Sequence, residues 1–279
     1  MCANERKRKQ VNTVQNKKAE IRFHEKLSLR MISDENLHQN ENDRIRELTT
    51  QDFKHIKMML DAGCGTGSFG EMLASEGHEV VGLDISRGLI SITKKHPSHS
   101  QNFMPIVGDL DRMPFKEGCF DMCISFFVLH HFPDIATVCS EFSRTLRNGG
   151  KILLIDTNGS NPYIKLTRSL AKHFGALLEK IGRATRNEGA HMHTTYIKKL
   201  SEVGFEDITV ESNCLGAYPY KSTTTNVLTC FIYTIAVIEG AILNIIWKTL
   251  PQPLRGHLLL IRGFRKKRNI VFNEMHYIK

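Results

Sequence analysis

The chain has 279 residues, of which 41% are hydrophobic and 24% are charged. These proportions are typical of a globular protein, and they exclude a chain that is disordered throughout, a collagen and a polytopic membrane protein. Seven cysteines are too few for a disulfide scaffold, so we interpret them as reduced thiols of a cytoplasmic protein.

The net charge of +9 is concentrated at the two ends of the chain. Residues 1–18 hold six Lys or Arg and one Glu, and residues 251–279 hold seven Lys or Arg and one Glu, so the body between them is close to neutral. Two interpretations remain open: the ends are solvated tails, or they contact an anionic membrane surface. We do not expect nucleic acid as a partner, because its enzymes carry positive charge on the working face.

Residues 1–50 are polar with weak apolar periodicity, which predicts a basic tail followed by N-terminal helices. Short apolar runs then alternate with helical segments. The predicted strands are Lys57–Leu60, Glu79–Leu83, Asn102–Val107, Phe120–Phe126 and Lys151–Ile155, and the predicted helices between them are Phe69–Ser75, Ser86–Lys95 and Ile135–Leu146. Near-continuous apolar strands with helical crossovers indicate a parallel sheet that is covered on both faces and doubly wound.

The order of elements changes after residue 156. The segment HTTYIKKLSEVGF at 193–205 predicts a helix that begins at Thr194 or Thr195 and ends at Gly204. Strands at 205–212 and 257–263 then form a late antiparallel pair. We therefore divide the chain into N-terminal helices with a basic tail at 1–50, a cofactor-binding core at 51–212, a hydrophobic insertion at 213–256, and the last strand with a basic tail at 257–279.

Residues 227–247, VLTCFIYTIAVIEGAILNIIW, are strongly apolar and contain one charge, Glu239. Their length is close to that of a bilayer span. A single crossing would, however, separate the strands that precede and follow the segment. Three interpretations remain open: a helical hairpin or in-plane helix docked on lipid, an apolar wall for a greasy substrate, and a buried core or dimer helix.

A glycine-rich turn follows the first strand in KMMLDAGCGTGSFG at 57–70. Glycines at 63, 65 and 67 permit tight turns and close approach of a cofactor to the backbone, above the N-terminus of the next helix. The turn alone is ambiguous, because Gly65, Gly67 and Gly70 also satisfy the GxGxxG spacing of dinucleotide sites.

Acidic residues at the ends of three strands distinguish the alternatives. Asp61 precedes the glycines, where a carboxylate would repel a pyrophosphate but suit a cofactor with an ammonium and a sulfonium. Asp84 ends the second strand, where it would bind ribose hydroxyls or cap the next helix. Asp109 follows the third strand, where it would accept a hydrogen bond from an adenine amino group or serve as a turn residue.

With these residues the sequence resembles the class I S-adenosylmethionine-dependent methyltransferases, particularly the branch that acts on small molecules and lipids. The matching segments are LDAGCGTG at 60–67, GLDIS at 82–86, GDLDRMPF at 108–115, FDMCISFFVLHHFPD at 120–134 and RTLRNGGKILLID at 144–156. The resemblance implies an α/β fold with a Rossmann-like, doubly wound, seven-stranded and mostly parallel sheet whose last strand is antiparallel. It also implies that S-adenosyl-L-methionine is the cofactor.

The resemblance further implies which residues bind that cofactor. They are Asp61, Gly63 and Gly65 around the methionine part, Asp84 on the ribose hydroxyls, Ile85, Asp109 and Leu110 at adenine, and Ser125 and Phe126 over the sulfonium.

Methyl transfer from a sulfonium is an in-line displacement, in which orientation is worth ~7–11 kcal/mol and a general base adds ~10²–10⁴-fold. The candidate catalytic base is His131, which follows the fourth strand with His130. The alternative is a loop histidine bonded to the backbone. We expect no metal site at His191 and His193, because only Glu188 lies near this HxH pair as a further ligand.

The sequence therefore predicts a methyltransferase that acts on a small-molecule or lipid-like acceptor, with oxygen as the expected acceptor atom. We expect it in the cytoplasm or peripherally on the inner face of a membrane. A nicotinamide-dependent oxidoreductase conflicts with Asp61 and Asp109, and a non-catalytic cofactor-binding protein conflicts with the intact pocket motifs. A nucleic-acid methyltransferase is disfavoured because SFFV at 125–128 lacks the (N/D)PPY signature. The acceptor itself and the oligomeric state are not predicted.

Overall fold

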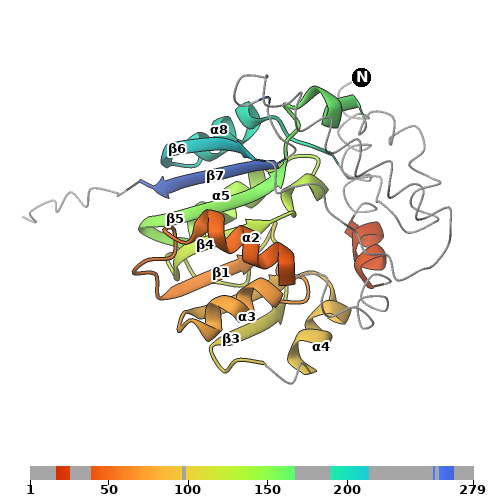
Figure 1. Ribbon diagram of the computed structural model, residues 1–279, viewed down its shortest axis with the longest axis vertical. Helices are drawn as coiled ribbons and strands as arrows, with labels where there is room; N and C mark the ends of the chain where they lie inside the picture. Colours follow the sequence, from red (N-terminus) through yellow and green to blue (C-terminus); the bar gives the residue numbers. More distant parts are fainter. Residues whose placement is uncertain are drawn as a thin grey trace, which may run out of the picture.

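The computed structural model describes residues 17–25, 39–95, 99–166, 189–213, 254 and 258–266. The strands are β1 (Met58–Ala62), β2 (Glu79–Asp84), β3 (Phe103–Val107), β4 (Phe120–Phe126), β5 (Leu146–Thr157), β6 (Phe205–Asn213) and β7 (Leu258–Arg265). They form one sheet in the order β3-β2-β1-β4-β5-β7-β6 (Figure 1). Strands β1 to β5 pair in parallel, and β7 runs antiparallel between β5 and β6. The predicted Rossmann-like sheet of seven strands is confirmed.

Helices cover both faces of this sheet (Figure 1). They are α2 (Gln39–Thr49), α3 (Ser68–Ser75), α4 (Arg87–Lys95), the short 3-10 helix η1 (Leu129–His131), α5 (Ala136–Thr145) and α8 (His193–Glu202). Helices α2 and α3 contribute to one hydrophobic core, and α5 and α8 contribute to the other. Residues 17–25 are also helical and lie beyond the carboxyl ends of the parallel strands, in red in Figure 1.

Strand β5 shows why a near-continuous apolar run forms the centre of such a sheet. Ile152 and Leu154 belong to the core under α5 and α8, whereas Leu153 and Ile155 belong to the core under α2 and α3. All four are at most 2% exposed. Because successive side chains of a strand point to opposite faces, a strand covered on both sides must be apolar at every position.

Most predicted boundaries differ from the structure by one or two residues, and two of the differences have a visible cause. Strand β5 begins at Leu146, which already pairs with Phe120, and pairing resumes at Lys151 after a register shift. Gly149 and Gly150 lie within this irregularity, and Gly149 has a φ of 75°. Helix α8 begins at His193, whose N–H donates to Ser160 Oγ at 2.9 Å, so its cap comes from a distant loop.

The apolar segment 227–247 lies outside the described residues, as do residues 1–16 and 267–279 of the two basic ends. Their interpretations therefore stay predictions. Across the helices that the structure describes, none combines the length and the apolar character needed to cross a bilayer.

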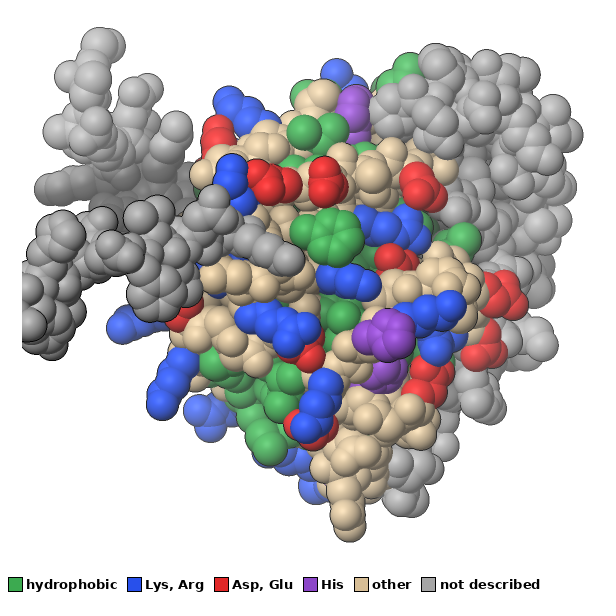
Figure 2. Space-filling model, turned by 90° about the vertical axis from the view of Figure 1, so that its left-hand side faces the viewer, with side chains coloured by type: hydrophobic (Ala, Val, Ile, Leu, Met, Phe, Trp, Pro, Cys, Tyr) green, Lys and Arg blue, Asp and Glu red, His purple; other side chains and the backbone are tan. Residues whose placement is uncertain are grey.

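The edge of the sheet where the parallel strands begin carries basic and acidic side chains side by side (Figure 2). Near the first residues of these strands, and on β7, oppositely charged side chains form ion pairs: Lys57–Glu79, Arg147–Asp121, Arg262–Asp52, Arg265–Glu117 and Lys266–Glu206. A mixed surface of this kind offers no continuous positive field for a polyanion.

Candidate functional site

The glycine turn between β1 and α3 holds three residues in the left-handed region, Gly63, Gly65 and Gly67, with φ values of 81°, 56° and 76°. The Gly63 N–H donates to Leu83 O at 2.7 Å, which ties the turn to the end of β2. A Cβ at Gly63 would lie 2.3 Å from a methyl carbon of Val128. A Cβ at Gly65 would meet nothing within 4 Å, so the backbone there faces open space.

That space belongs to a cavity of about 630 Å³ at the carboxyl ends of the parallel strands. Parallel α/β sheets bind ligands at this edge. Nine of the ten predicted site residues line the cavity: Asp61, Gly63, Gly65, Asp84, Ile85, Asp109, Leu110, Phe126 and His131. The topology thus brings together residues from four separate segments of the sequence.

Asp61 is the most buried of the acidic residues that line the cavity, and it is 4% exposed. Burial, together with the neighbouring charge of Asp84, raises its pKa to about 7, against an ordinary value of 3.8. A hydrogen bond from the Gly70 backbone acts in the opposite direction. Among the residues that the structure describes, no cationic side chain pairs with Asp61 to offset the desolvation of its carboxylate, so the site favours a ligand that supplies positive charge.

Asp84 links the end of β2 to both neighbouring turns. Its Oδ2 accepts from the Gly65 N–H at 2.9 Å, and its Oδ1 accepts from the Ser86 N–H at 2.8 Å. Helix α4 is capped by Ser86 rather than by Asp84, because Ser86 Oγ accepts from the Leu89 N–H at 3.2 Å. Asp84 has both a structural role in the turn and a position on the cavity wall.

Asp109 follows β3 and is paired with the N-terminal helical segment. Lys17 Nζ lies 2.7 Å from Asp109 Oδ2 and 2.6 Å from Asp111 Oδ2. Asp109 Oδ1 accepts from the Asp111 N–H at 3.0 Å, which is the turn contact that the sequence left as an alternative. A ligand that approaches Asp109 therefore shares this carboxylate with a lysine that sequence analysis did not identify.

Ser125 and Phe126 at the tip of β4 were both predicted to lie over the sulfonium, but they differ in whether they reach the cavity. Phe126 lines the cavity, but Ser125 is 1% exposed and donates its hydroxyl to Ala62 O at 2.8 Å. Ser125 therefore holds β4 to β1 and does not reach the cavity. Phe127 beside it has a φ of 58°, a conformation that bulky residues rarely adopt and that concentrates at functional sites.

The two consecutive histidines of η1 point to different environments. His130 is buried, and both its N–H and its Nδ1 bond the carboxylate of Asp156, at 2.9 and 2.7 Å. Burial disfavours the charge on Asp156, but the charge and hydrogen bonds of His130 outweigh it and lower the Asp156 pKa. His131 lines the cavity, as predicted, so the Asp156–His130 pair holds η1 in the position that directs His131 inward.

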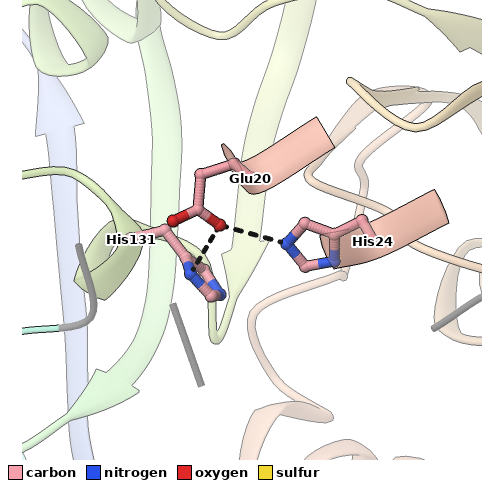
Figure 3. A group of neighbouring side chains, drawn as sticks. All are labelled: Glu20, His24 and His131. Atoms are coloured by element: carbon pink, nitrogen blue, oxygen red, sulfur yellow. Dashed lines mark ion pairs between the residues drawn. The ribbon is translucent and has the colours of Figure 1, made fainter. Parts of the chain in front are cut away.

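Two residues of the N-terminal helical segment meet His131 (Figure 3). Glu20 Oε2 lies 3.3 Å from His131 Nδ1 and 3.6 Å from His24 Nε2. The imidazole rings of His24 and His131 also make an edge contact, with centroids 5.2 Å apart. Burial lowers the pKa of His131, although Glu20 acts to raise it.

The two histidines of the HxH pair contact oxygen atoms of the described residues. His191 Nε2 lies 2.8 Å from Phe132 O, and His193 Nδ1 lies 2.7 Å from Ser160 Oγ. These partners are backbone and hydroxyl oxygens of neighbouring loops.

The cavity fits S-adenosylmethionine by its chemistry. Three acidic strand ends, Asp61, Asp84 and Asp109, converge on it, and the open backbone at Gly65 allows close approach. A buried carboxyl group with a raised pKa complements a cation, whereas the pyrophosphate of a dinucleotide would add negative charge beside it.

Comparison with known proteins agrees with this geometry. Residues 60–154 match the family described as a methyltransferase domain. A malonyl-[acyl-carrier protein] O-methyltransferase from Serratia marcescens is 31% identical over 97 residues, 35% of this chain and 37% of that protein. A demethylmenaquinone methyltransferase from Oceanobacillus iheyensis is 36% identical over 105 residues, 36% of this chain and 44% of that protein. The matched segments thus span less than half the length of these relatives.

Solved structures share the fold over a larger part of the chain. A SAM-dependent methyltransferase from Thermotoga maritima has a TM-score of 0.58 at 15% identity, and covers 88% of this chain and 99% of its own. A phosphoethanolamine N-methyltransferase from Haemonchus contortus, solved with S-adenosyl-L-methionine, has a TM-score of 0.55 at 18% identity, and covers 81% of this chain and 53% of its own. At these identities the likeness establishes the fold.

Sequence analysis missed the contribution of the N-terminal segment, namely Lys17, Glu20 and His24. The i, i+4 spacing of Glu20 and His24 is the one feature that could have drawn attention to them, because it puts both side chains on one helix face.

Proposed function

We propose that this chain, which carries an S-adenosylmethionine-dependent methyltransferase domain at residues 60–154, transfers a methyl group to a small-molecule or lipid-like acceptor, at oxygen, by in-line displacement. The observation that carries the proposal is the buried Asp61, with its raised pKa, on a cavity that two further acidic strand ends also line. Such an arrangement selects a cationic cofactor over a dinucleotide.

The proposed binding roles follow the order of the strands. Asp61, with the glycine backbone at 63 and 65, would bind the amino-acid part of the cofactor, and Asp84 would accept hydrogen bonds from the ribose. Ile85 and Leu110 would pack on adenine, with Asp109 near its amino group and Phe126 toward the sulfonium. When bound, the cofactor supplies an electrophilic methyl group. The chain then contributes mainly orientation of the acceptor in a closed cavity.

The proposed catalytic role of His131 is to accept the proton of the acceptor hydroxyl. Its lowered pKa keeps the imidazole unprotonated near neutral pH, so the ring is free to accept a proton. The Glu20 carboxylate, 3.3 Å from His131 Nδ1, would stabilise the imidazolium that forms. The Asp156–His130 pair would act by positioning η1.

The class of acceptor is inferred from the relatives and from the apolar segments of this chain. The relatives include enzymes named for malonyl-[acyl-carrier protein] and for demethylmenaquinone. Phe126, Phe127 and Phe132 on the cavity wall suit an acceptor with an apolar part. We also propose a cytoplasmic protein whose apolar segment 227–247 and basic C-terminus contact an anionic membrane.

Binding of the cofactor tests the proposal through Asp84. The variant Asp84→Ala removes a carboxylate that can accept two charge-assisted hydrogen bonds, each worth about 1.5–3 kcal/mol, so we expect at least about 100-fold weaker binding of S-adenosylmethionine by calorimetry. Asp84→Asn keeps an acceptor for the Ser86 N–H and separates turn damage from lost ligand contacts. Asp207→Ala, an exposed position of β6, is the control. Wild-type affinity in Asp84→Ala would reject the site.

Catalysis is tested by the formation of S-adenosylhomocysteine with a malonyl thioester or a demethylated naphthoquinol. A rate above that measured without acceptor supports the enzyme. Tight cofactor binding with no turnover on either compound would favour the non-catalytic alternative.

A further inference from the structure

Glu20, His24 and His131 form a cluster on the wall of the cavity (Figure 3). Glu20 and His24 are one turn apart on the helical segment 17–25, and His131 approaches them from η1. Each residue offers one ligand atom, and these atoms all lie within 4.8 Å of one another. The exposed fractions of the three side chains are 10%, 20% and 16%, so the cluster is largely screened from bulk water.

The separations within the cluster are longer than good hydrogen bonds. Glu20 Oε2 lies 3.3 Å from His131 Nδ1 and 3.6 Å from His24 Nε2, whereas well-formed bonds to nitrogen measure about 2.7–3.2 Å. His131 Nδ1 is buried, and among the described residues its contact with Glu20 Oε2 does not reach hydrogen-bond geometry. A buried ring nitrogen without a hydrogen bond is costly, and it requires a partner.

The same separations match the edges of a metal coordination shell. Ligands at about 2.0–2.1 Å from a tetrahedral Zn²⁺ lie roughly 3.3–3.4 Å from one another. The distances from Glu20 Oε2 to His131 Nδ1 (3.3 Å) and to His24 Nε2 (3.6 Å) are close to this ligand–ligand distance. The ligand atoms of His24 and His131 lie within 4.8 Å of each other. Two imidazoles and one carboxylate are also a common donor set of catalytic zinc sites, which leave a fourth position open.

We propose that Glu20, His24 and His131 bind a divalent transition metal of the Zn²⁺ type, with an open coordination position that faces the cavity. The metal site itself does not depend on methyl transfer, but its role rests on the proposed function. At the open position the metal would bind the acceptor oxygen and lower the pKa of its hydroxyl group, so that the proton leaves to solvent and the alkoxide or enolate becomes the nucleophile. In the metal-bound enzyme His131 serves as a ligand, and activation of the hydroxyl by the metal replaces the role of base that His131 has in the proposed metal-free reaction.

This site predicts the class of acceptor more narrowly than the cavity alone. A metal of the Zn²⁺ type, intermediate between hard and soft, with an open coordination position selects acceptors that present a hydroxyl, an enol or a carboxylate oxygen. An amine acceptor, which is protonated at neutral pH, would be a poor ligand. The site would also join the N-terminal helical segment to the core, since two ligands come from residues 17–25 and the third from η1.

The test uses the full chain after treatment with a chelator, and titration with Zn²⁺ in a calorimeter. We expect one Zn²⁺ per chain, and at least about 10–100-fold weaker binding in both Glu20→Gln and His24→Gln, because each variant removes one of three ligands. His99→Gln is the matched control: His99 pairs with Glu71, away from the cavity lining, and this variant should bind as the wild type does. Co²⁺ as a substitute metal should give the intense visible absorption of a four-coordinate site in the wild type and in His99→Gln alone.

Three results would overturn the metal site: no binding of Zn²⁺, equal affinity in wild type and Glu20→Gln, or a weak Co²⁺ spectrum that His24→Gln leaves unchanged. Binding of S-adenosylmethionine is measured in the same preparations with and without Zn²⁺. If the cofactor binds and Zn²⁺ does not, the metal site fails while the proposed function stands. If Zn²⁺ binds in the predicted way and the cofactor does not bind, the proposed function fails while the metal site stands.

Discussion

Asp61→Asn gives the sharpest test of the electrostatics of the site. The substitution keeps the shape of the side chain and an oxygen that can accept from the Gly70 N–H, but it removes the titrating group. Burial raises the pKa of Asp61 from its ordinary 3.8 to about 7. The folded state therefore holds this proton to higher pH than the unfolded chain does, and the unfolding free energy of the wild type falls as the pH rises from about 4 to about 7.

The size of the effect follows from the two pKa values. Their difference corresponds to about 4 kcal/mol at full ionisation, at about 1.4 kcal/mol per pH unit. Most of this cost develops between pH 5 and pH 8, where linkage gives about 2–3 kcal/mol. Asp61→Asn should lack this pH dependence, so its stability relative to the wild type should rise by that amount over the same interval.

Urea unfolding at pH 5, 6, 7 and 8 measures the difference. The isosteric control is Asp207→Asn, because Asp207 is exposed at a φ of 51°, a conformation that asparagine tolerates. A second readout is the affinity for S-adenosylmethionine, which should strengthen from pH 6 to pH 8 in the wild type as Asp61 ionises, and should be weak and independent of pH in Asp61→Asn. If the stability difference between Asp61→Asn and the wild type is the same at every pH, the carboxyl group does not titrate near neutrality and the reasoning fails.

Two further outcomes are expected. Asp156→Ala should lower the unfolding free energy by about 3–5 kcal/mol, because it leaves the buried His130 without the carboxylate that it contacts. Since pairing lowers the Asp156 pKa, this stabilisation in the wild type is present at neutral pH and diminishes as the pH falls below about 3.8. Urea curves that coincide with the wild type at pH 7 would contradict it. The full chain should sediment with vesicles that contain phosphatidylserine, less so at high salt, and not with neutral phosphatidylcholine vesicles. Equal recovery in the supernatant with both lipids would remove the membrane contact.

The sequence by itself determined the central part of the fold. In β5 the unbroken run at 152–155 predicted a strand that is buried on both faces, and the structure confirms it. The positions of Asp61, Asp84 and Asp109 at strand ends were also readable, because the carboxyl ends of parallel strands meet at one edge whatever the details of packing. Boundaries were less accurate where local preference competed with sheet pairing, as at Leu146, where pairing with Phe120 extends the strand past two glycines.

Only the tertiary structure decided which side chains meet in the cavity. The sequence identified His131 but could not show that Glu20 and His24 lie against it, because contacts between distant segments depend on how the helix at 17–25 packs across the strand ends. For the same reason the sequence could not show that Ser125 donates its hydroxyl to Ala62 O, or that Lys17 pairs with Asp109. Hydrophobic periodicity and turn-forming residues are local properties, so they can be recognised in the sequence. The burial that raises the Asp61 pKa, and the close approach of Glu20, His24 and His131, arise only when the chain has folded.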